Sequence, residues 1–319
     1  MSEKETFYKD AELCTVERTH LDDHITDSGL IEIDKLFGDA DALSLENYRK
    51  TNKYRIYLIV CGILVTLSFI LYDELETNLI FRLICIVSVI VLVILSKTIV
   101  NKEHHRKHLQ YRVLAESLRA QFFISYAGFD EKVADMLPWI IKHDMPWVIE
   151  LLKGLPKVKT ENKYAPQAFC KNQREYHEEH KKSDKFYSKA NVDLNRISLY
   201  ITIILYIVLF VFDAFVVNFD NGSLDLNLAH FIIKLLLGVM TAITLFSENL
   251  FGKVSSSIKV DEHKRRLKLY CEICPVIVEN MYDNKEITKE NFLYLIHEFL
   301  IENSTWYVYE SQNKLRIAI

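Results

Sequence analysis

Four long apolar blocks, arranged as two pairs, constrain this chain more than any other feature. The first pair covers Ile56 to Tyr72 and Leu79 to Ser96, and the second covers Ile197 to Val217 and Leu228 to Phe246. A helix that crosses the hydrocarbon core of a bilayer needs about 20 mostly apolar residues, and about 17 are tolerated. Buried helices of a soluble protein are the alternative, but these rarely occur as pairs that are apolar on all sides and flanked by basic clusters. The pattern predicts an all-α integral membrane protein with four transmembrane helices, arranged as two hairpins with long helical cytosolic extensions.

The distribution of charge predicts the orientation of these helices. Lys and Arg cluster before and after each pair of blocks, whereas the connecting turns, residues 73–78 and 218–227, contain acidic residues and no Lys or Arg. By the positive-inside rule, both termini and the middle segment are expected on the cytoplasmic side. The first 43 residues are polar and do not resemble a cleavable signal sequence, so the first block is expected to remain as an anchor.

The pattern divides the chain into five expected segments. Residues 1–43 form an acidic N-terminal cytosolic tail that we expect to be partly disordered. Residues 44–128 hold the first hairpin, with spans 56–72 and 79–96, and a helical stalk. Residues 129–180 form a cytosolic hinge with short helices. Residues 181–280 hold the second hairpin and its stalk, with spans 197–217 and 228–246. Residues 281–319 form C-terminal cytosolic helices.

One phrase, E-H-x-R-[KR]-x-x-x-Y, follows each pair of blocks and indicates a duplication. The first copy comprises Glu103, His104, Arg106, Lys107 and Tyr111, and the second comprises Glu262, His263, Arg265, Arg266 and Tyr270. Its place just inside the cytosolic face predicts a coupling collar that contacts lipid phosphates or an anionic ligand. His104 and His108 also have the i, i+4 spacing of two zinc ligands, but basic side chains beside a span are ordinarily solvated, so no metal is predicted.

Charged residues within or beside the blocks are candidates for an ion path. Asp213 and Lys234 lie inside the third and fourth blocks, and Asp73 with Arg82 form a similar acid-then-base pair in the first hairpin. A charge inside a bilayer is costly unless it is paired or wetted. Two interpretations stay open: an aqueous ion path, or a structural intramembrane pair whose lysine reaches toward the headgroups.

The remaining segments give local expectations. Leu79 to Ala127 contains neither Gly nor Pro and predicts one continuous helix that stops at Gly128. Pro138 and Pro146 look like first-turn prolines of two short helices. The apolar face around Trp147 either lies in the membrane interface or packs on the stalks. Pro275 is expected to interrupt the last stalk, and Phe292, Leu295, Ile296, Phe299 and Leu300 form the apolar stripe of a C-terminal helix that Thr288 caps. His177 is expected on a solvated helix face.

No constellation of residues predicts an enzyme. The pair Cys271 and Cys274 is a lone C-x-x-C without a redox-fold context, and no phosphate-binding loop or nucleophile elbow is present among only eight glycines. No catalytic residue, cofactor or nucleic-acid partner is therefore expected.

The helix after the first hairpin resembles a known bacterial group. The spacing H-x-x-Y-R-x-L-A-E-x-L-R-x-Q is carried by His108, Tyr111, Arg112, Leu114, Ala115, Glu116, Leu118, Arg119 and Gln121. It is similar to the SLATT group of membrane effector domains, and the resemblance covers about residues 44–128. The second copy departs after Tyr270, so the chain looks like a tandem, four-span relative.

The resemblance implies a membrane-permeabilising, pore-forming effector of a bacterial anti-phage defence system. Such an effector would act at the bacterial inner membrane as a homo-oligomer, causing depolarisation and abortive infection. Its trigger would be a cytosolic activator protein or a cyclic nucleotide. The alternative is a non-conducting scaffold or sensor that recruits cytosolic partners.

Overall fold

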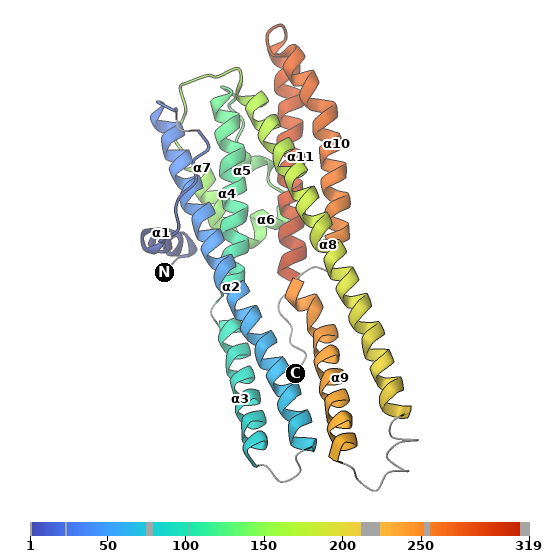
Figure 1. Ribbon diagram of the computed structural model, residues 1–319. Coiled ribbons are helices and arrows are strands. Elements are labelled where there is room, and N and C mark those ends of the chain that lie inside the picture. The colour runs from blue at the N-terminus through green and yellow to red at the C-terminus, as the bar shows by residue number, and fades with distance from the viewer. Residues whose placement is uncertain are drawn as a thin grey trace. The chain divides into compact units, whose positions relative to one another are not determined.

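The chain folds into helices that belong to two compact units. The computed structural model describes residues 2–22, 24–74, 79–101, 103–211, 224–251 and 256–312, and these contain helices and no strand, as the sequence predicts (Figure 1). Unit 1 comprises Met1–Thr51, Glu103–Glu179 and Glu262–Ile319, and unit 2 comprises Asn52–Lys102 and His180–Asp261. Each unit is therefore built from segments that are distant in sequence.

Eleven labelled helices account for most of the described residues. They are α1 (Glu3–Leu13), α2 (Ser28–Glu74), α3 (Leu79–Asn101), α4 (His104–Tyr126), α5 (Val133–Met136), α6 (Trp139–Asp144), α7 (Pro146–Lys153), α8 (Ala165–Val211), α9 (Leu224–Phe251), α10 (Ser256–Asn280) and α11 (Lys285–Gln312). Helices α2 and α8 each contribute their first part to one unit and their last part to the other.

The N-terminal segment, expected to be partly disordered, is folded. Leu30, Ile33, Phe37 and Ala40 repeat at spacings of three and four residues and are at most 2% exposed, which is the apolar stripe of a packed helix. Asp27 caps α2 by accepting a hydrogen bond from the Gly29 amide at 2.8 Å. Its carboxylate also accepts from the Lys159 amide at 3.0 Å, and these backbone bonds lower the pKa of Asp27 to about 2. The prediction of disorder rested on the acidic composition of the segment and overlooked the spacing of these four apolar residues.

The expected continuous helix from Leu79 to Ala127 is broken at Glu103. Glu103 lies between α3 and α4 and has a φ of 50°, in the left-handed region. The two helices also belong to different units, α3 to unit 2 and α4 to unit 1. The predicted stop at Gly128 is confirmed: its φ is 74°. The amides of Gly128 and Phe129 donate to the Ser125 and Ile124 carbonyls at 3.0 and 3.1 Å, as in a Schellman motif.

The short helices of the middle segment pack inside unit 1. Pro138 precedes α6 and Pro146 occupies the first turn of α7, as predicted. Trp147 is only 6% exposed, and its ring centroid lies 5.9 Å from that of Phe7 and 6.3 Å from that of Tyr111. Of the two interpretations of this face, the structure shows packing against α1 and α4. Trp139, in contrast, is 71% exposed.

The C-terminal helices differ from the prediction in three places. Pro275 lies within α10 rather than ending it. Asn284, not Thr288, caps α11, because its side chain accepts from the Ile287 amide at 3.2 Å. His177, expected on a solvated face, is 1% exposed. The predicted stripe of α11 is confirmed, since Phe292, Leu295, Ile296, Phe299 and Leu300 are all at most 4% exposed.

The prediction of four transmembrane helices is wrong, and so is the localisation built on it. In the described ranges, no helix is both long enough and apolar enough to cross a bilayer. In α2 and α8 the apolar block is the last part of a helix of 47 residues whose first part carries many charged and polar residues. The predicted span 197–217 passes beyond α8, which ends at Val211, into residues outside the described part.

The predicted ion-path residues lie mostly outside the description. Asp213 falls in residues 212–223, and the side chains of Asp73 and Arg82 are likewise outside the described part. Lys234 lies in α9 and is half-buried.

Candidate functional site

The first copy of the repeated phrase attaches α1 to α4. The Lys107 ammonium and the Tyr111 hydroxyl both donate to the Asp10 carboxylate, at 2.6 and 2.7 Å. Arg106 bonds to Glu3 at 2.6 Å and to Glu103 at 2.7 Å. Tyr111 is 2% exposed, and burial together with the Asp10 carboxylate raises its pKa. The basic residues of this copy are therefore paired with acidic residues of the same unit.

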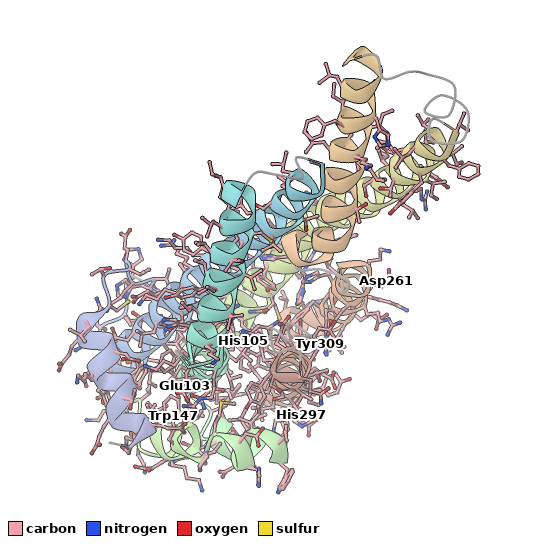
Figure 2. The ribbon with its side chains drawn as sticks, turned by 90° about the horizontal axis from the view of Figure 1, so that it is seen from below. Glu103, His105, Trp147, Asp261, His297 and Tyr309 are labelled. Carbon is pink, nitrogen blue, oxygen red and sulfur yellow. The ribbon has the colours of Figure 1, made fainter. Side chains whose placement is uncertain are left out.

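The histidines of α4 connect this helix to α2 and α11. Nδ1 of His104 lies 2.9 Å from the Asn47 side-chain oxygen, and Nδ1 of His108 lies 3.0 Å from the Ser44 hydroxyl. Nε2 of His105 lies 3.1 Å from the Glu310 carbonyl, so the start of α4 meets the end of α11, where Figure 2 labels Glu103, His105 and Tyr309. The i, i+4 pair His104 and His108 is thus used for helix packing.

The second copy attaches α10 to α8 and α11. Nδ1 of His263 lies 2.9 Å from Nδ1 of His177, and Arg266 contacts Glu298 at 3.1 Å and Glu302 at 3.4 Å. Tyr270 is 1% exposed, whereas Arg265 is exposed. Both copies therefore join neighbouring helices through a buried tyrosine and a basic residue that pairs with carboxylates of another helix, Lys107 in the first copy and Arg266 in the second.

Around the second copy the structure assembles a buried ionic cluster. Its members come from four helices of unit 1: Arg112, Glu116 and Arg119 of α4, Tyr176 and His177 of α8, His263 and Arg266 of α10, and Glu302 of α11. We use the name buried ionic cluster for these residues below.

Glu116 lies at the α4 side of the cluster. Its side chain is 2% exposed, and its two carboxylate oxygens lie 2.5 Å from Arg112 and 3.0 Å from Arg119. Arg112 contacts Asp41 of α2 as well, at 3.3 Å. Burying a charged group is costly, and opposite charges at these distances offset part of that cost. The sequence spacing, in which arginines stand four residues before and three residues after Glu116, supplies both partners on one helix.

Glu302 is the carboxyl group of the cluster that titrates near neutral pH. Burial is the largest cause of its shift and raises its pKa to about 7, against the opposing effect of Arg266. Nε2 of His177 lies 3.8 Å from a Glu302 carboxylate oxygen, and the Glu302 side chain is 18% exposed. The neighbouring carboxylates Glu116 and Glu262 raise the pKa further. A pKa of about 7 lies within the ordinary range of cellular pH.

The arrangement is a junction of four helices held by buried charged and hydrogen-bonding side chains. No three His, Cys, Asp or Glu side chains within the described residues converge as metal ligands. A hollow of about 480 Å³ between α1 and α2 is bordered by Arg18, Lys35 and Asp39 among others, so its wall carries both cationic and anionic groups. Sequence reasoning assigned no site role to Glu116, His177 or Glu302, because polar residues along a helix look solvated until the partner helices are known.

Comparisons with known proteins give no relative: no family model, curated protein or solved structure matches this chain. The predicted resemblance to the SLATT group stays a prediction.

Proposed function

We propose that this chain is a non-catalytic helical scaffold whose copies associate through unit 2 and present unit 1 to partner proteins. The observation that carries the proposal is a pair of exposed apolar seams, one on α3 and one on α8. Both seams have the spacing with which helices pack against each other in coiled coils.

The α3 seam consists of five side chains at alternating spacings of three and four residues. They are Ile80, Leu83, Val87, Ile90 and Ile94, and their exposed fractions are 61, 59, 56, 52 and 57%. At 1.5 Å per residue, such a seam extends about 21 Å along the helix. Exposed apolar surfaces of this extent are rare on monomeric proteins and mark interaction sites.

The α8 seam repeats this spacing in the second hairpin. Its members are Ile197, Tyr200, Ile204, Ile207 and Val211, with exposed fractions of 55, 59, 58, 58 and 47%. Other apolar side chains of both helices are exposed as well, among them Val89 of α3 and Phe210 of α8, so each seam is the row of a wider apolar surface that has the spacing of a coiled-coil contact. When two such helices lie side by side, each side chain of one seam inserts between four residues of the facing helix.

A second copy of this chain is the partner that matches these seams. Neither seam contains a charged side chain, and charge-depleted contact surfaces are typical of permanent homo-oligomers rather than transient complexes. Each copy also carries both seams, so association of copies can bury every seam without a further protein. The homo-oligomer expected from the sequence is retained here on this ground.

Paired variants on one helix test the proposal. Val87→Glu places a charge in the α3 seam, whereas Val89→Glu makes the same change two residues away, on the opposite side of the helix. Val89 is 43% exposed. Sedimentation velocity of the full-length chain over a range of concentrations should show an oligomer for the wild type and for Val89→Glu. The association constant of Val87→Glu should fall at least tenfold.

Tryptophan fluorescence checks that unit 1 stays folded, because Trp139, Trp147 and Trp306 all belong to unit 1. Far-UV circular dichroism checks that the helices of unit 2 stay formed in both variants. A monomeric wild-type chain would overturn the proposal. So would equal effects of the two variants, or a chain that becomes monomeric once detergent micelles or lipid cover its apolar helices.

The predicted role as a pore-forming defence effector depended on four spanning helices. The described helices do not supply them, so membrane permeabilisation is not part of this proposal. A role in defence stays a prediction.

A further inference from the structure

Helices α8 and α10 run antiparallel in unit 1, and their contacts fix which residues face each other. The hydroxyl groups of Tyr164 and Tyr282 lie 2.9 Å apart at one end. At the other end, the ring centroids of His177 and Tyr270 are 5.5 Å apart. His177 also meets His263, with 2.9 Å between their Nδ1 atoms, so it lies between His263 and Tyr270. Two turns back along α8, this register brings Cys170 opposite Cys274 of α10.

The two thiols lie together in the core. Cys170 is 3% exposed and Cys274 is 4% exposed, and both are free thiols. They share a hydrogen bond, which raises the pKa of Cys170 and lowers the pKa of Cys274. Arg174, one turn along α8, favours the thiolate form of both. A buried pair of cysteines on facing helices is the arrangement from which a disulfide forms with little movement.

A third cysteine connects this pair to the surface. Cys271 is exposed and lies three residues before Cys274 on α10, so the two are neighbours on the helix surface. Pro275 follows inside the helix, and its missing N–H leaves the Cys271 carbonyl without the usual helical donor. One backbone hydrogen bond of α10 is therefore missing beside these two cysteines.

We propose that Cys170 and Cys274 form a reversible disulfide in response to hydrogen peroxide, and that Cys271 is the cysteine oxidised first. The Cys271 thiolate attacks the peroxide, an S–O bond forms, the O–O bond breaks and hydroxide leaves. The Cys274 thiolate then displaces hydroxide from the Cys271 sulfenic acid, which gives a Cys271–Cys274 disulfide. The Cys170 sulfur then attacks the Cys274 sulfur and its proton passes to the departing Cys271 sulfur, so the Cys271–Cys274 bond breaks as the Cys170–Cys274 bond forms.

The overall reaction is balanced: two thiols lose two hydrogen atoms, and one peroxide becomes two molecules of water. A small-molecule thiol such as dithiothreitol reverses it. The product joins α8 to α10 beside the buried ionic cluster, so oxidation fixes the junction in which His177 and His263 meet. Oxidation should therefore raise the melting temperature of unit 1.

Peptide mapping of the peroxide-treated full-length chain tests this proposal directly. Trypsin separates Cys170, in residues 164–171, from Cys271 and Cys274, which share residues 269–285. A crosslink between these two peptides, located at Cys170 and Cys274 by fragmentation and lost on reduction, is the expected result. Cys170→Ser should remove the crosslink and accumulate a disulfide within peptide 269–285, and Cys271→Ser should slow crosslinking at least tenfold. Cys14→Ser is the matched control and should leave the rate unchanged.

Two results would overturn the proposal. One is a wild-type chain in which peroxide oxidises Cys271 while Cys170 and Cys274 both stay alkylatable after unfolding. The other is a crosslink that forms as fast in Cys271→Ser as in the wild type. Because the first result is read on the wild type, it does not depend on the folding of any variant.

Discussion

Nδ1 of His177 and Nδ1 of His263 lie 2.9 Å apart, so a hydrogen bond between two imidazoles joins α8 to α10. One ring must donate and the other must accept, which requires at least one neutral nitrogen at this contact. The Glu302 carboxylate is 3.8 Å from Nε2 of the same His177. Three titratable groups from three helices therefore share one buried junction, and the protonation state of any one of them affects the other two.

Glu302 should make the stability of unit 1 fall as pH rises toward neutrality. Its folded-state pKa of about 7 lies above the ordinary value of 4.5, so the folded state holds this proton more tightly than the unfolded state. The contribution is present below pH 4.5 and is lost as pH rises through 7, by at most about 3 kcal/mol at 1.4 kcal/mol per pKa unit. Urea unfolding at pH 5 and pH 8, followed by tryptophan fluorescence, should show this slope, and Glu302→Gln should flatten it.

Glu298→Gln is the control for this slope. Glu298 also contacts Arg266, at 3.1 Å, but the variant retains the Glu302 carboxyl group. If the pH slope survived in Glu302→Gln and disappeared in Glu298→Gln, the assignment of this proton to Glu302 would be wrong.

Asp10 should be needed to hold α1 on the rest of unit 1. Its carboxylate accepts from both Lys107 and Tyr111, and Asp10→Ala would leave the buried Tyr111 hydroxyl without this acceptor. Loss of two such bonds should cost about 2–3 kcal/mol in local stability. Hydrogen exchange of residues 3–13 should accelerate by an order of magnitude or more, with the remaining unit 1 amides little changed. Glu12→Ala, on the same helix, should leave the exchange rate near the wild-type value.

Trp147 and Trp139 should differ sharply in their contribution to stability. Trp147 packs among Phe7 and Tyr111, so Trp147→Ala should destabilise unit 1 by about 3–5 kcal/mol. Trp139→Ala changes a side chain that is 71% exposed, so its effect should stay within about 0.5 kcal/mol. Circular dichroism during urea unfolding measures both free energies. Comparable losses would mean that Trp147 is not part of the core.

Gly128 and Gly154 provide a matched pair of glycine variants. A Cβ on Gly128 would lie 2.7 Å from the Glu161 Cγ, at a φ of 74° that favours glycine. Gly128→Ala should therefore destabilise unit 1 by about 1–2 kcal/mol. A Cβ on Gly154 meets nothing closer than 3.5 Å, and its φ is −82°, so Gly154→Ala should be neutral or slightly stabilising. Thermal unfolding of both variants distinguishes these outcomes, and equal melting temperatures would contradict the strain at Gly128.

Helical structure was readable from the sequence wherever a local rule determines it. The stop at Gly128 follows from the backbone freedom of glycine, and Pro146 begins α7 because its ring fits the first turn of a helix. The stripe from Phe292 to Leu300 also follows from spacing alone. Even the repeated phrase was visible as a pattern, although its use was not.

Other features depend on neighbours that sequence does not specify. Helices α2 and α8 have 47 residues each, with a polar part followed by an apolar part. Hydropathy alone predicts that the apolar part is a separate transmembrane helix. Pro275 remains inside α10 because packing on α8 and α11 outweighs one lost hydrogen bond. The acidic N-terminal segment folds because Leu30, Ile33 and Phe37 meet a core supplied by α4, which is distant in sequence.

The sequence by itself determined that the chain is helical, where several of its helices begin or end, and that one phrase occurs twice. Only the tertiary structure decided what that phrase does. Whether Arg266 or Lys107 faces solvent, lipid or a carboxylate depends on which helix lies opposite, and that follows from the packing of the whole unit. Glu302 titrates near pH 7 for the same reason, because burial and neighbouring charges, rather than residue type, set the pKa of a carboxyl group.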